Sequence, residues 1–119
     1  MKIEKLPYEL TVAQYETPPK APKGFFSLSS AQGEISLVCE TKNLPLGATA
    51  REDGWRAFML AGPMDFSLVG VLSEIASVLA SNEIPIFALS TFDTDYILVK
   101  EEYFSAAAVA LSEAGHEIL

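Results

Sequence analysis

The chain has 119 residues, half of them hydrophobic, which suits one compact domain or two very small subdomains and excludes a disordered chain. Sixteen acidic and eight basic residues give a formal net charge of −8, which repels phosphate backbones and argues against nucleic acid as a partner. The single cysteine excludes an internal disulfide, which suits the cytoplasm.

The N-terminal and the most apolar segments predict neither a signal peptide nor a membrane span. The start of the chain, MKIEKLPYELTV, lacks the apolar stretch that a signal peptide needs. The most apolar run, Phe66 to Ala80, is too short to cross a bilayer and contains Glu74. We therefore expect a cytoplasmic protein that does not bind membranes.

The first half of the chain predicts strands joined by polar and proline-rich segments. Tyr8–Tyr15 has the alternation of a strand, and the three prolines of Thr17–Gly24 exclude a helix and predict a loop. Phe26–Glu40 predicts a hairpin in which a Gln-Gly pair supplies the turn. Thr41–Ala50 forms at best one helical turn, and Arg51–Gly54 is a polar boundary.

The second half begins with a strand that leads into a helix. Trp55–Ala61 predicts the strand, and Gly62–Asp65 predicts a turn whose last residue is a candidate N-cap. Phe66–Ser81 predicts the helix, because four apolar residues recur on one face at helical spacing. These residues are Leu68, Leu72, Ile75 and Leu79.

The remaining segments complete a β-α-β-β-α-β order. Ile86–Thr91 and Asp95–Val99 predict strands that flank a turn at Phe92–Thr94. Glu101–Ala114 predicts a second helix and His116–Leu119 a short final strand. This order predicts the α+β class, a ferredoxin-like βαββαβ sandwich with both helices on one face of a four-stranded antiparallel sheet.

An internal repeat links the two halves. Phe26–Glu40 (FSLSSAQGEISLVCE) and Phe87–Glu101 (FALSTFDTDYILVKE) align without a gap, and identical residues recur throughout both segments. The repeat predicts that both segments are β-hairpins, with a degenerate half at residues 1–53 and a regular one at 54–119. A duplicated fold has a seam between its units, where a small ligand can be held, so the repeat favours a binding module over an enzyme.

Two segments of the second half resemble a known family. Gly62–Gly70 (GPMDFSLVG) and Ile86–Val99 (IFALSTFDTDYILV) are similar to the ACT domain. The resemblance is to the aspartokinase-type branch, which includes the eukaryotic cytosolic arginine sensors (the CASTOR family) and small bacterial tandem-ACT proteins. It covers nearly the whole chain and implies an ACT fold that binds an amino acid.

The resemblance implies a ligand site where the loop into the first helix of one ACT unit meets a neighbouring unit. That loop corresponds here to Met64, Asp65, Phe66, Ser67, Leu68 and Val69, and the strand-turn segment to Thr91, Phe92 and Asp95. The arginine sensors carry an acidic residue and a glycine near Phe66 and Leu68, and this chain has neither there. Independently, a helix N-terminus suits an α-carboxylate, and an aspartate can pair with the ammonium.

Each candidate residue also has a structural interpretation. Asp65 can act as an N-cap alone, and Asp93 and Asp95 can be ordinary turn residues. A metal site at these two aspartates lacks a visible third ligand, so no metal is expected. Cys39 and His116 are the residue types of a nucleophilic pair, but no third residue that would orient the histidine is identified. We therefore favour a core cysteine and an exposed strand-edge histidine.

These observations predict a non-enzymatic regulatory ACT protein that binds an amino acid at a seam between units. The alternative is a protein-interaction or assembly module without a small ligand, and a weaker third option is an enzyme. No cofactor is expected. Because exposed sheet edges favour association, we expect a homodimer.

Overall fold

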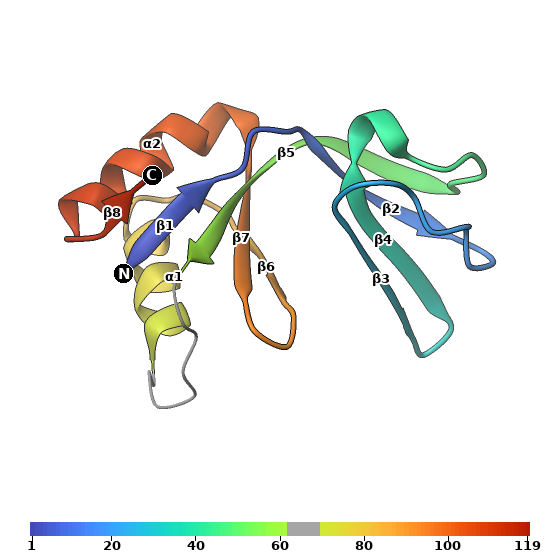
Figure 1. The fold of residues 1–119 in the computed structure, drawn as a ribbon, viewed down its shortest axis with the longest axis horizontal. Coiled ribbons are helices and arrows are strands. Elements are labelled where there is room, and N and C mark those ends of the chain that lie inside the picture. Colours follow the sequence, from blue (N-terminus) through green and yellow to red (C-terminus); the bar gives the residue numbers. More distant parts are fainter. Residues whose placement is uncertain (62–69) are drawn as a thin grey trace. The chain divides into compact units, whose positions relative to one another are not determined.

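The computed structural model describes residues 1–61 and 70–119, which form two compact units (Figure 1). The first unit combines Met1–Pro7 with Arg56–Leu119, and the second is Tyr8–Trp55. The first seven residues therefore belong with the second half of the sequence. Whether residues 1–53 descend from a degenerate ACT-like half remains a proposal.

The first unit contains one mixed sheet in the strand order β6-β7-β5-β1-β8. Strand β1 pairs antiparallel with β5 and parallel with β8, and β6 pairs antiparallel with β7. The prediction of a four-stranded, wholly antiparallel sheet was therefore wrong. The strands are β1 (Lys2–Lys5), β5 (Ala50–Ala61), β6 (Phe87–Ser90), β7 (Asp95–Lys100) and β8 (Glu117–Ile118).

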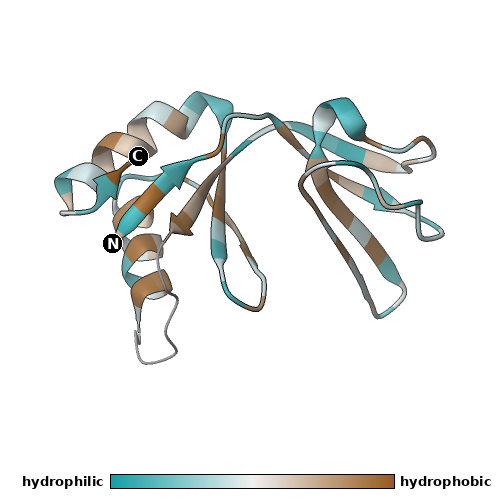
Figure 2. Ribbon diagram, viewed as in Figure 1, coloured by the Kyte–Doolittle hydropathy of each residue, from teal (hydrophilic) through white to brown (hydrophobic). Residues whose placement is uncertain are grey.

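Strand β1 gives almost no sequence signal. Its four residues, Lys-Ile-Glu-Lys, carry a single apolar side chain, and Figure 2 shows that hydrophobic band between hydrophilic ones. Ile3 is nevertheless fully buried and pairs with Leu60 on one side and Ile118 on the other. The partners of β1 lie about 60 and 115 residues away along the chain, so tertiary contacts, and no local pattern, make it a strand.

Both helices pack on the same face of this sheet, which confirms the predicted layers and the α+β, ferredoxin-like class. The helices are α1 (Val71–Ser81) and α2 (Glu101–Glu113). Alternate residues of the strands meet residues from both helices in one core, as the two-residue period of a strand requires. The core comprises Ile3, Phe58, Leu60, Ile75, Leu79, Ile84, Ile97, Val99, Phe104, Ala107 and Leu111.

Helix α1 begins later than the sequence predicts. Its N-cap is Gly70, whose φ of +84° is left-handed, so a right-handed helix does not continue backward through this residue. The predicted start at Phe66 lies outside the described residues, as does the predicted N-cap, Asp65. Of the predicted apolar stripe, Ile75 and Leu79 are fully buried.

Arg56 joins three elements of the first unit. Its guanidinium donates to the Leu6 carbonyl at 3.1 Å and pairs with Glu101 of α2 at 3.2 Å. The guanidinium carbon also lies 4.1 Å from the centroid of the Phe104 ring. This cation–π contact and the two polar contacts fix the start of α2 against β5.

The second unit is a four-stranded antiparallel sheet in the order β3-β4-β2-β5. Residues 8–55, all of which the structure describes, contain no α-helix. Its small core consists of Ala13, Tyr15, Leu37 and Cys39. The elements are β2 (Leu10–Tyr15), β3 (Phe26–Ala31), β4 (Glu34–Glu40), the 3-10 turn η1 (Thr41–Asn43) and the first residues of β5.

Strand β5 starts at Ala50, five residues before its predicted start at Trp55. The polar residues 51–54 were interpreted from the sequence as a boundary, but Arg51 and Glu52 pair with Ala13 and Val12 of β2, and the register shifts beyond them. The side chains of this polar stretch are largely exposed, so the strand carries no apolar alternation there. A polar stretch of strand is not detected by a search for hydrophobic periodicity.

Both repeated segments form β-hairpins, as the repeat predicts. Their registers differ by two residues: Phe26 faces Cys39, whereas the equivalent Phe87 faces Leu98. A two-residue turn closes the first hairpin, with Gln32 and Gly33 both at positive φ, and four residues close the second. A register shift of two residues keeps every side chain on the same face of the sheet. The longer turn of the second hairpin therefore does not change which residues of the repeat point to each face.

Candidate functional site

Three of the nine predicted site residues lie together at one end of the β6–β7 hairpin: Thr91 and Phe92 in the turn, and Asp95 at the start of β7. The Thr91 amide donates to the Thr94 carbonyl at 2.8 Å, and the Thr91 hydroxyl reaches the same carbonyl at 3.2 Å. Phe92, at the tip of the turn, is 87% exposed. The turn therefore presents an aromatic ring and two hydroxyl-bearing residues on an ordered backbone.

Asp95 begins β7 at the base of this turn. Its carboxylate accepts a hydrogen bond from the Ser90 hydroxyl of the facing strand. The two residues are direct partners in the β6–β7 register, so the hairpin itself positions the carboxylate. Asp95 is half-buried, and a carboxylate accepts several hydrogen bonds, so one donor does not exhaust its capacity.

The other six predicted site residues, Met64 to Val69, lie outside the described residues. The structure therefore does not test whether they approach the β6–β7 turn. Within the described part of the first unit, Glu74 stands in the first turn of α1, where a negative charge suits the helix dipole. Its amide closes the first helical turn on the Gly70 carbonyl at 2.8 Å.

His116 is more enclosed than the sequence analysis expected. Its side chain is 10% exposed, and its Nε2 lies 2.8 Å from the Glu74 carboxylate. The prediction of an exposed strand-edge histidine was wrong, because the ring is largely enclosed and pairs with Glu74 of α1. Glu74 is forty-two residues from His116 along the chain, so no local sequence pattern could have predicted this contact.

Cys39 is a fully buried member of the second unit's core. Burial, with a smaller contribution from the neighbouring Glu40 carboxylate, raises the pKa of its thiol. A raised pKa keeps the thiol protonated near neutral pH, where only the thiolate is a nucleophile. His116 belongs to the other unit. The geometry therefore favours a core cysteine.

We expect Cys39 to resist alkylation in the folded protein. At pH 8 the thiol is both protonated and covered, so iodoacetamide should react at least about tenfold more slowly than with the chain unfolded in urea. Mass spectrometry follows the reaction, since the chain has one cysteine. Equal rates in the two states would contradict the burial and the raised pKa.

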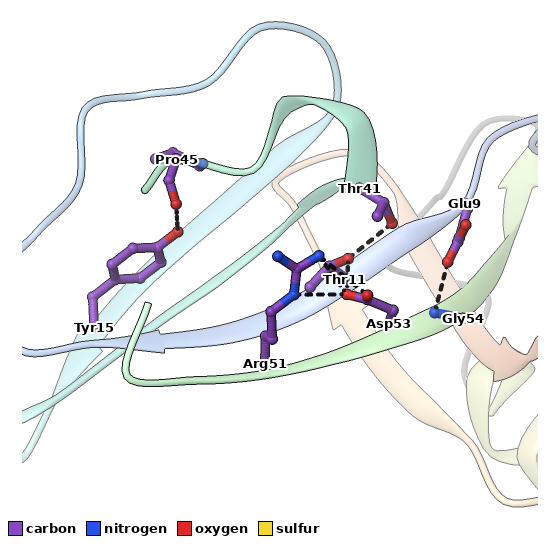
Figure 3. A network of polar contacts seen from close by, with 8 residues as sticks. All are labelled: Glu9, Thr11, Tyr15, Thr41, Pro45, Arg51, Asp53 and Gly54. Atoms are coloured by element: carbon purple, nitrogen blue, oxygen red, sulfur yellow. Dashed lines mark hydrogen bonds and ion pairs between the residues drawn. The ribbon is translucent and has the colours of Figure 1, made fainter. Parts of the chain in front are cut away.

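A polar network that the sequence analysis missed crosses the second unit (Figure 3). Thr11 is fully buried, and its hydroxyl lies 2.8 Å from both the Thr41 hydroxyl and the Asp53 carboxylate. The Arg51 guanidinium donates to both oxygens of the same carboxylate, with Nη2 at 2.9 Å from Oδ1 and 3.1 Å from Oδ2. The spacing of Arg51 and Asp53 on a strand was the one available signal, since residues two apart share a face.

Two further hydrogen bonds tie loops to this sheet. Tyr15 donates its phenolic proton to the Pro45 carbonyl at 2.6 Å, and the Gly54 amide donates to Glu9 at 3.0 Å. Burial raises the pKa of Tyr15, with a smaller contribution from Cys39. The phenol therefore remains a donor at neutral pH and holds the loop after η1.

Among the described residues we looked for metal-ligand clusters and for helices that could span a membrane. Across residues 1–61 and 70–119, no three His, Cys, Asp or Glu side chains gather in a way that would hold a metal ion. Neither α1 nor α2, the α-helices in that part of the chain, has the length and apolarity needed to span a bilayer.

The sequence model of the ACT domain matches residues 50–113. Among curated proteins, the human cytosolic arginine sensor for mTORC1 subunit 1 is 33% identical over 85 residues, which cover 66% of this chain and 26% of that protein. The bovine protein matches to the same extent. The chain thus spans about a quarter of the length of the curated relatives it matches.

Solved structures agree with this match. The crystal structure of protein Atu0741 from Agobacterium tumefaciens has a TM-score of 0.87 and 31% identity, covering 99% of this chain and 91% of that one. The regulatory subunit of aspartate kinase from Thermus thermophilus, in its ligand-free form, has a TM-score of 0.66. It is 10% identical and covers 97% of each chain, so it shows likeness of fold alone.

Proposed function

Because the chain belongs to the ACT-domain family, in its aspartokinase and arginine-sensor type, we propose that it is a non-enzymatic regulatory protein that binds an amino acid. The relatives named above include a sensor of arginine and a regulatory subunit of a kinase. Regulation by a bound amino acid is the function that this chain would share with them.

The observation that carries the proposal is the polar turn between β6 and β7, which lies inside the matched region. An amino acid carries both charges, so its site needs an anion for the ammonium and donors for the carboxylate. Asp95 supplies the anion, and the Thr91 and Thr94 hydroxyls supply polar partners beside it. Met64 to Val69 would supply amide donors, as the family resemblance implies.

Three further points belong to the proposal. The protein would act in the cytoplasm, and it would associate as a homodimer, because open sheet edges favour pairing with a second copy. Residues 1–53 would be a degenerate ACT-like half. The competing candidate is an assembly module without a small ligand, which the 87% exposed ring of Phe92 favours, since exposed aromatic side chains often mark protein contacts.

A thermal-stability screen of the twenty amino acids tests the proposal. An amino acid at a hundred times its dissociation constant should stabilise the fold by about 2.7 kcal/mol. Asp95→Asn should then weaken binding of that amino acid by about ten- to a hundredfold, because a charge-assisted bond is lost while the shape is kept. Calorimetry of wild type and variant measures the change.

Asp93→Asn is the matched control. Asp93 lies in the same turn, is exposed and carries the same charge, so its replacement should leave the affinity within about twofold. Should Asp95→Asn bind as tightly as the wild type, Asp95 is only a turn residue and the site lies elsewhere. If no amino acid stabilises the protein, the assembly module becomes the better candidate.

A further inference from the structure

A cavity lies in the second unit. Its volume is about 360 Å³, and it opens where β2 begins and β4 ends. The side chains that line it come from Tyr8, Glu9, Glu40, Thr41 and Lys42. This set combines two carboxylates, a hydroxyl and an aromatic ring with one lysine.

Glu40 is the unusual member, because its side chain is only 10% exposed and a buried glutamate is rare unless it is paired. Its Oε2 accepts a hydrogen bond from the Phe25 amide at 3.0 Å. Its Oε1 lies 3.8 Å from the Lys42 ammonium, which is beyond hydrogen-bond distance. The Lys42 side chain is 77% exposed, so this pairing is weak.

The carboxylate of Glu40 is held in place by the chain around it. A Cβ atom at Gly24 would lie 1.8 Å from Oε2, so the absence of a side chain there makes room for the carboxylate. Together with the Phe25 bond, this packing engages Oε2, and Glu40 is one of the residues that line the cavity.

The polar network fixes the hydrogen-bonding character of Thr41. The Asp53 carboxylate only accepts hydrogen bonds, so the Thr11 hydroxyl donates its proton to it. The Thr11 oxygen must then accept from the Thr41 hydroxyl, 2.8 Å away. Thr41 has thereby used its one hydroxyl proton, and toward the cavity its oxygen acts as an acceptor.

We propose that this cavity binds an organic cation with several N–H donors, an alkylguanidinium or alkylammonium group without a carboxylate. Glu9, Glu40 and Thr41 present acceptors, and Tyr8 adds an aromatic wall suited to a cation. The ligand would take the place of the exposed Lys42 ammonium beside Glu40. An α-carboxylate would meet two like charges here, which separates this ligand from the amino acid proposed above.

NMR titration of the full chain with methylguanidinium and methylammonium chlorides tests the proposal and distinguishes the two cations. We expect saturable shifts centred on the amides of Glu9, Thr41 and Lys42. Sodium chloride at equal ionic strength and neutral methylurea should not reproduce them. Shifts that do not saturate, or that sodium chloride matches, would overturn the proposal.

Three variants sharpen the test. Glu40→Gln keeps an acceptor for the Phe25 amide but removes the charge, and it should weaken binding at least about tenfold. Glu34→Gln is the matched control, because it removes an exposed charge at the far end of β4 and should leave binding unchanged. Lys42→Met should tighten binding about severalfold, since it removes the competing ammonium.

The variants also cover a failure to fold. If Glu40→Gln is unfolded, Glu9→Gln tests the same charge at a more exposed residue and should weaken binding in the same direction. Weaker binding by Lys42→Met, or equal weakening by Glu34→Gln, would contradict the proposed site. Because the two sites lie in different units and take different ligands, failure of this test leaves the amino-acid proposal unaffected.

Discussion

Replacing Phe58 with alanine should destabilise the protein by about 3–5 kcal/mol. Phe58 is fully buried in the core of the first unit, and its ring stacks on Phe104 of α2 with the ring centroids 4.7 Å apart. Truncation would remove the transfer free energy of the ring and leave a cavity between β5 and α2. Urea unfolding of wild type and variant measures the loss.

The neighbouring Met59 provides a control on the same strand. Successive side chains of a strand point to opposite faces, and Met59 is half-buried outside the core that contains Phe58. Met59→Ala should therefore cost clearly less, about 1 kcal/mol. If the two variants lose equal stability, the side of β5 that packs on α2 has been wrongly assigned.

Gly24→Ala should destabilise the protein by about 2–5 kcal/mol. Gly24 has a φ of +75°, where a side chain costs about 1–2 kcal/mol, and its Cβ would lie 1.8 Å from the Glu40 carboxylate. Displacing that carboxylate would break its bond to the Phe25 amide, which adds about 1–3 kcal/mol for a buried charged group. Urea unfolding again provides the measurement.

Gly33→Ala distinguishes the cost of the left-handed backbone from the cost of displacing the Glu40 carboxylate. The Gly33 φ of +78° is nearly the same, but a Cβ there would meet no atom within 4 Å. Gly33→Ala should therefore show the backbone cost alone, about 1–2 kcal/mol. Equal losses for the two glycine variants would mean that the Glu40 carboxylate moves aside without cost, and that it is not held as described.

The repeat and the helical periodicity allowed much of the fold to be predicted. Helix α2 was expected at Glu101–Ala114 and is observed at Glu101–Glu113, and both repeated hairpins form. These elements carry strong local signals: an acidic first turn, an apolar face, and a glycine after the last turn. Local signals are sufficient where the element's own residues decide its conformation.

The remaining elements depend on partners far along the chain. Strand β1 has one apolar residue, and the first part of β5 has a polar sequence, so neither shows the alternation that identifies a strand. Strand β1 is held by pairing with β5 and β8, and the first part of β5 by pairing with β2. The start of α1 differs because Gly70 is left-handed, and a glycine in an apolar run does not reveal its φ.

The candidate site was predictable only where its residues are close together in the sequence. Thr91, Phe92 and Asp95 were expected near one another because they are close in sequence, and the turn brings them together. The network around Thr11 and the cavity beside Glu40 join residues 15 to 42 positions apart. No spacing rule links such residues, since their proximity arises only when the sheet has formed.

The β6–β7 hairpin of the first unit combines a buried anchor with an accessible turn. The hairpin of β6 and β7 is anchored in the core by Ile97 and Val99, which are fully buried, while its turn stays accessible. A rigid scaffold that carries an accessible polar turn is the usual arrangement for a binding loop. Binding there could alter the association of the protein without any catalytic group, as a regulatory role requires.

The amino-acid proposal is tested most directly by NMR titration of the full-length wild-type chain with each of the twenty amino acids. The account predicts that one amino acid produces saturable shifts centred on residues 91–95, which are the β6–β7 turn and the first residue of β7, Asp95. If no amino acid produces saturable shifts at millimolar concentration, or if the shifts fall only on residues 8–55, the proposed function and its site are contradicted.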